Sequence, residues 1–132
     1  MTTIHAEGHF EVTLDVLPAY EEQEGGIFDQ ATVNKKLYGD IEGTAVAQML
    51  RTMSPVAGSA AYVALERVTG TLHGKKGTFA LVHRATAQGG GRELGIVVVP
   101  DSGTGELTGI KGDFVINVVD GKHFWTFDYT LD

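Results

Sequence analysis

Glu66 and His83 are the two residues of this 132-residue chain whose types and positions most suggest chemistry. They lie in two strand-like segments, 61–72 and 78–86, in which side chains of different character alternate. Because successive side chains of a strand point to opposite faces, this alternation places both among apolar neighbours. A carboxylate and an imidazole in an apolar interior can perform acid/base catalysis or bind a polar ligand group.

The turn between the two segments decides how these residues lie relative to each other. If Lys75 and Lys76 form a two-residue loop, Val68 lies opposite His83, and Glu66 becomes the diagonal neighbour of His83 on the same face. A shift of the loop by one residue would place them on opposite faces. The sequence therefore predicts a Glu66–His83 pair that depends on the turn.

The face that carries this pair is the better candidate for the core. The opposite face carries Arg67 and Arg84, which this register places directly opposite each other. Two like charges at that spacing are unfavourable when buried, so their face is expected to meet solvent. The predicted inner face consists of Tyr62, Ala64, Glu66, Val68, Gly70, Leu72, Phe79, Leu81, His83 and Ala85.

Two interpretations of the pair remain open. In the first, Glu66 and His83 bond to each other or to Tyr62 or Tyr38 and only complete a polar network in the interior. In the second, burial raises the pKa of Glu66, and the pair binds a ligand or transfers protons. No third ligand converges on the pair, so no metal site is predicted.

Composition excludes several classes of function. The net charge is −7, from 17 acidic and 10 basic residues without a basic run, which argues against a nucleic-acid partner. The absence of cysteine excludes disulfides, thiolate metal sites and a cysteine nucleophile. No signal peptide and no apolar stretch of ~20 residues are evident, so we expect a cytoplasmic protein without a membrane partner. Residues 1–132 are expected to form one domain.

The remaining segments also favour strands. Residues 5–14 alternate, and the last strand, 122–131, follows an Asp120-Gly121 hairpin turn and carries Trp125 on its predicted inner face. Residues 44–53 fit either a short helix or a strand. The glycine-rich segment 101–106 lacks the lysine and the spacing of a phosphate-binding loop.

About eight antiparallel strands with short turns predict an all-β protein, either a closed barrel or a sandwich. Glycines inside the strands suit the bends of a small barrel. The interior of an eight-stranded barrel can be filled by side chains or can hold one small ligand, as in lipocalin-like barrels. We therefore predict a closed eight-stranded antiparallel barrel.

The segments YVALERVTGTLHGKKGTFALVH and VVVPDSGTGELTGIKGDF resemble a bacterial family of small proteins of unknown function that is assigned to the allene oxide cyclase-like barrels. The resemblance covers nearly the whole chain. The resemblance implies the eight-stranded antiparallel barrel and an extended segment 44–53. It implies no activity, because fold does not determine function. The pattern comprises Tyr62, Glu66, Gly70, Gly74, Gly77, His83, Pro100, Ser102 to Gly105, Gly109 and Gly112.

Three hypotheses for the function follow. The first is a barrel that binds a small apolar or amphipathic molecule, with Glu66 and His83 as polar anchor. The second is a cofactor-independent isomerase or cyclase with the same pair as acid and base. The third is a filled barrel that acts through self-association, for example as a homodimer, or through a protein partner. No cofactor is expected. The candidate ligand-binding residues are Tyr38, Tyr62, Glu66, Phe79, His83 and Trp125.

Overall fold

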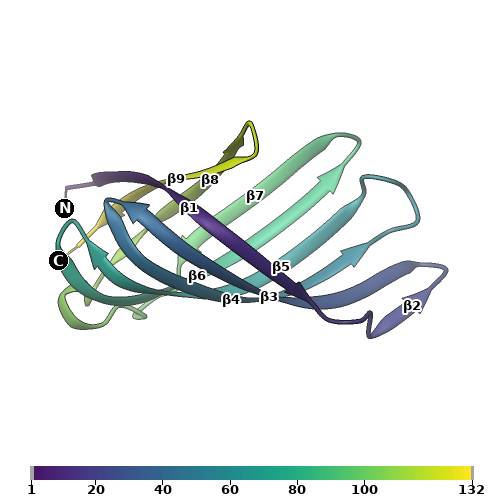
Figure 1. Ribbon diagram of the computed structural model, residues 1–132, viewed down its shortest axis with the longest axis horizontal. Coiled ribbons are helices and arrows are strands. Elements are labelled where there is room, and N and C mark those ends of the chain that lie inside the picture. Colours follow the sequence, from purple (N-terminus) through teal and green to yellow (C-terminus); the bar gives the residue numbers. More distant parts are fainter. Residues whose placement is uncertain (1, 132) are drawn as a thin grey trace.

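Residues 2–131, which this computed structural model describes, form nine strands in one antiparallel sheet (Figure 1). The strands are β1 (Ile4–Val16), β2 (Glu21–Gln23), β3 (Gly26–Gly39), β4 (Ile41–Met53), β5 (Ala60–Leu72), β6 (Lys75–Gln88), β7 (Gly91–Val98), β8 (Lys111–Val119) and β9 (Lys122–Thr130), with a short 3-10 helix, η1 (Gly105–Leu107), between β7 and β8. No helix within residues 2–131 has the length and apolar character needed to cross a membrane.

β1 closes the sheet into a barrel. It pairs with β9 along Ile4 to Phe10 and with β3 along Gly8 to Val16, so the first strand joins both ends of the strand order. The short β2 only extends the sheet beside the first residues of β3. The prediction of a closed eight-stranded antiparallel barrel is therefore confirmed.

The ambiguous segment 44–53 belongs to strand β4. Its helix-like spacing arises because apolar side chains lie on both faces: Ala47 points inward, whereas Val46 and Leu50 are 48% and 50% exposed on the outside. β3 and β5 flank this segment and supply its backbone hydrogen bonds along its whole length. This pairing outweighs the weak helical pattern.

The predicted turn of the central hairpin was wrong. The loop is His73-Gly74, with φ of 48° and 79°, and not Lys75-Lys76. A type I′ turn needs positive φ at both central residues, which glycine provides without strain and which histidine adopts more readily than lysine. The register moves accordingly, so that Ala64 lies opposite His83.

The faces of the hairpin nevertheless agree with the prediction. Each residue's partner changes by four positions, an even number, so every side chain keeps its face. Glu66 is still the diagonal neighbour of His83. Arg67 and Arg84 are exposed as expected, but they do not face each other, since Arg67 lies opposite Ala80.

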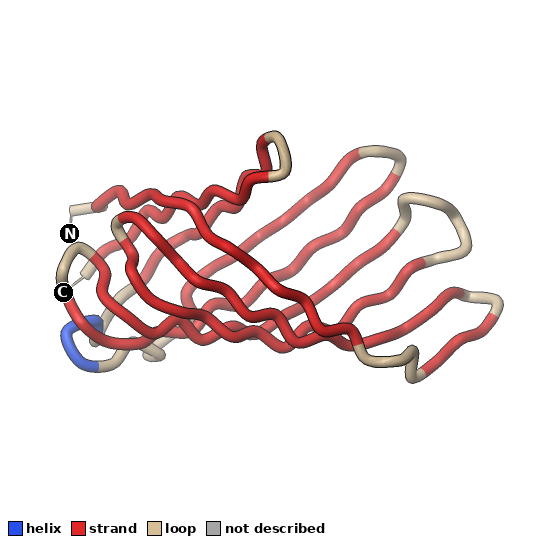
Figure 2. The backbone as a smooth tube through the Cα atoms, viewed as in Figure 1, coloured by secondary structure: helices blue, strands red, loops and turns tan. Residues whose placement is uncertain are grey.

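One end of the barrel is packed with side chains. The start of β1, the end of β9 and η1 lie at this end, and the tips of the hairpins that follow β2, β4, β6 and β8 lie toward the other (Figure 2). Stacked aromatic rings fill this end, with 5.5 Å between the centroids of Phe79 and Phe127 and of Phe114 and Trp125. The largest fully buried side chains are Trp125, Phe79, Phe127, Ile41, Leu72, Leu81, Leu107 and Ile110.

The weakest seam of the barrel lies between β7 and β8, where Val97 and Asp113 are the one bridged pair within the described chain. The glycine-rich segment after β7 protects the edge of β6 that β7 leaves uncovered. Thr104 N–H donates to Thr78 O at 2.8 Å, and Ala80 N–H donates to Ser102 Oγ at 3.0 Å. This motif therefore completes the sheet.

Candidate functional site

Glu66 accepts hydrogen bonds from two basic side chains in the middle of the barrel. His83 Nε2 lies 2.7 Å from Glu66 Oε1, and Lys35 Nζ lies 2.9 Å from Glu66 Oε2. The three side chains are 8% exposed or less. They come from β5, β6 and β3, and together they form a charged layer on top of the packed end.

Small residues of β4 allow this contact between strands that are not neighbours. β4 lies between β3 and β5, with Ala45 paired to Lys35 and Ala47 paired to Glu66. Because both alanines point inward and are short, the long side chain of Lys35 passes over β4 to reach Glu66. A larger residue at either position would obstruct this path.

The environment of Glu66 lowers the pKa of its carboxyl below the ordinary value. Burial by itself raises this pKa, but the hydrogen bond from His83 and the positive charge of Lys35 lower it further than burial raises it. The expected raised pKa was therefore wrong, because Lys35 had not been recognised as a counter-ion. Glu66 is therefore ionised at neutral pH and has no proton to donate.

The ionised carboxylate determines which nitrogen of His83 faces the cavity as an acceptor. A carboxylate only accepts hydrogen bonds, so Nε2 carries the proton, and neutral His83 has its lone pair at Nδ1. Nδ1 makes no hydrogen bond to any residue from 2 to 131. Since no fully buried polar side-chain atom there lacks a partner, Nδ1 reaches the cavity that His83 lines. It can accept a proton or a hydrogen bond from a bound molecule.

Above the charged layer lies a cavity of about 280 Å³. It exists because inward positions of β4 and β5, such as Ala47 and Ala64, carry small side chains at this height. Its walls are mainly apolar. The lining residues are Phe10, Val12, Leu14, Val33, Lys35, Ala47, Met49, Tyr62, Ala64, His83, Arg92, Leu94, Ile116, Val118 and His123.

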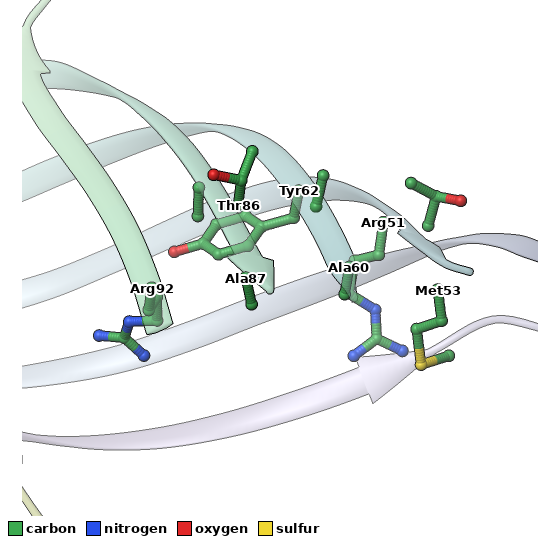
Figure 3. Close-up of a pocket in the computed structure, with 10 residues that line it drawn as sticks. Arg51, Met53, Ala60, Tyr62, Thr86, Ala87 and Arg92 are labelled. Carbon is green, nitrogen blue, oxygen red and sulfur yellow. The ribbon is translucent and has the colours of Figure 1, made fainter. Parts of the chain in front are cut away.

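A second hollow of about 200 Å³ adjoins the cavity near the tips of the hairpins (Figure 3). Tyr62 and Arg92 line both spaces. In Figure 3 the ring of Tyr62 lies between Arg51 and Arg92, with its hydroxyl toward the Arg92 side. Arg51 is held by Asp29 through two hydrogen bonds of 2.8 and 2.9 Å. Burial raises the pKa of Tyr62, so its hydroxyl keeps its proton and can donate.

Comparison with known proteins assigns the chain to a family. The profile of DUF3224, described as a protein of unknown function, matches residues 6–129. The chain belongs to the DUF3224 family. It is similar to the crystal structure, at 1.84 Å resolution, of a DUF3224 protein with unknown function from Shewanella oneidensis MR-1, with a TM-score of 0.93 and 36% identity over 99% of each chain. No curated protein matches this chain. The expected membership of a family of unknown function is confirmed.

In this DUF3224 protein the predicted ligand-binding residues occupy three different places. Tyr62 and His83 line the cavity. Glu66 does not line it, but it contacts two residues that do, His83 and Lys35. Phe79 and Trp125 point inward as expected, but they belong to the packed end. Tyr38 follows the inward Leu37 and stacks on His9 at 5.0 Å on the outer surface, where it cannot contact the interior.

Two basic residues of the site were missed. Lys35 had a signal, because it alternates with Val33 and Leu37, which are both buried in β3. Arg92 had a weaker form of the same signal, because it alternates with Leu94 and Ile96 on the inner face of β7 but directly follows the glycine-rich turn. Within residues 2–131 no group of three or more histidine or carboxylate side chains could hold a metal ion.

Proposed function

We propose that this DUF3224 protein binds a small apolar or amphipathic molecule inside its barrel. The observation that carries the proposal is the cavity of about 280 Å³, with apolar walls and the unpartnered Nδ1 of His83 in its lining. Ligand sites in proteins typically combine such walls with a few placed polar groups.

The paired charges under the cavity fit this proposal. Lys35 and His83 satisfy both oxygens of Glu66, so the layer needs no ligand to be stable. A structural role for the charged network is therefore compatible with ligand binding in the cavity. The cavity also disfavours the third hypothesis, that of a completely filled barrel.

Binding of N-phenyl-1-naphthylamine, a neutral probe that fluoresces in apolar surroundings, tests the proposal. We expect saturable binding to the wild type and its loss in Ala64→Phe, which fills the cavity. The matched control is Val63→Phe, because Val63 is the preceding residue of β5 and is 50% exposed on the outer face. Equal binding by both variants, with native circular dichroism, would contradict the proposal.

The second candidate is a cofactor-independent isomerase or cyclase. The orientation of His83 by an ionised carboxylate favours it, since this arrangement supports an imidazole that acts as a base. His83, and not Glu66, would then be the base. Any ligand extracted from the purified protein should be converted by the wild type and left unchanged by His83→Gln, as followed by mass spectrometry. Equal conversion by the variant would exclude this role.

The other expectations stay predictions. They concern the cytoplasmic location, a homodimer, and the absence of a cofactor and of nucleic-acid or membrane partners.

A further inference from the structure

The charged side chains that face the interior give it a net positive charge, although the chain carries −7. Among residues 2–131, three cations and two carboxylates lie on strand faces directed at the interior, which leaves +1 with the histidines neutral; of the five, Arg92 is exposed, beside the turn between β6 and β7. No other acidic residue between positions 2 and 131 lines either hollow. The inward charged residues are Asp29, Lys35, Arg51, Glu66 and Arg92.

Arg92 is the source of this excess charge. Lys35 is paired with Glu66, and Arg51 is paired with Asp29. Arg92 makes no ion pair and no side-chain hydrogen bond within residues 2–131. Its guanidinium therefore keeps all its donors available at the place where the two hollows meet.

We propose that the ligand is an apolar molecule with one anionic group, such as a carboxylate, and that Arg92 binds this group. This inference rests on the proposed function and specifies its ligand. Tyr62 lines the same space and can donate its hydroxyl to the anion. The apolar part lies over Ala64 toward His83, in the cavity that the alanines leave open.

Guanidinium is suited to this task. Its planar fork binds a carboxylate through two parallel hydrogen bonds, which gives orientation as well as affinity. The acidic outer surface opposes an anion only weakly, because at physiological salt the field of exposed charges is screened within about 8 Å. The nearby charge of Arg92 therefore decides which ligand is preferred.

Two fluorescent probes that differ in charge test the inference. 1-Anilinonaphthalene-8-sulfonate is anionic, and N-phenyl-1-naphthylamine has the same rings without the sulfonate. We expect Arg92→Gln to weaken binding of the anionic probe about fivefold, the size expected for an exposed ion pair, and to leave the neutral probe unchanged. Arg92→Lys should retain part of the preference. Arg84→Gln, on the exposed face of β6, is the matched control and should change neither affinity.

The outcomes separate the inference from the proposed function. Loss of the anionic preference in Arg92→Gln alone supports the inference. If Ala64→Phe abolishes binding of the neutral probe but Arg92→Gln leaves the anionic probe unaffected, the inference is wrong and the binding function stands. If the wild type binds neither probe, both are wrong.

Discussion

At the residue scale, Glu66 is the counter-ion that allows Lys35 to remain charged inside the barrel. Removal of one partner of a buried pair leaves the other charge without compensation, which typically costs about 3–5 kcal/mol. Glu66→Gln should therefore lower the free energy of unfolding by about this amount in urea titrations. The double variant Lys35→Met/Glu66→Gln should recover most of the loss, because it removes both charges. A double variant as unstable as the single one would contradict this role of Lys35.

The lowered pKa of Glu66 also predicts how stability depends on pH. A carboxyl group whose pKa is lower in the folded than in the unfolded state stabilises the fold above its ordinary pKa of 4.5. This contribution is lost as the pH falls from that value through the folded pKa. Urea titrations between pH 6 and pH 3 should therefore show a smaller loss of stability for Lys35→Met/Glu66→Gln than for the wild type. Asp29, whose pKa Arg51 lowers, is unchanged in both proteins. Parallel pH profiles would contradict the assignment.

At the element scale, the faces of the strands were predictable and the contacts between distant strands were not. Alternation assigned Glu66 and His83 to the inner face correctly. The wrong turn did not change this assignment, because the register moved by an even number of residues. The reach of Lys35 to Glu66 depends on the order β3-β4-β5 and on two short side chains of β4. No local pattern contains that information.

A pair of facing glycines allows the backbones of β4 and β5 to approach each other closely. Gly43 pairs with Gly70, and a Cβ on Gly43 would overlap Thr69 O. Gly43→Ala should destabilise the protein by about 1–3 kcal/mol through overpacking. Gly95→Ala in β7 is the control, since its Cβ would meet nothing within 4 Å, and it should change stability by less than about 0.5 kcal/mol. Thermal unfolding compares the two variants. Equal melting temperatures would contradict a close backbone contact at Gly43.

At the scale of the whole molecule, the barrel is packed at one end and hollow at the other. Phe79 and Trp125 fill the end where β1 starts and β9 ends, whereas Ala47 and Ala64 leave space toward the hairpin tips. The sequence predicted that the two aromatic residues point inward but not that they lie below the cavity. Alternation reports the face of a residue, and only the stagger of the strands sets its height along the barrel.

The outer surface offers the competing location for an apolar molecule. Leu50, Val63 and Leu65 are exposed on neighbouring strands and border an outer hollow of about 480 Å³. A crystal structure of the complex with N-phenyl-1-naphthylamine distinguishes the two locations directly. Our account predicts the probe inside the barrel, in contact with Ala64 and His83. A probe bound only over Val63 and Leu65, with the interior unchanged, would contradict it.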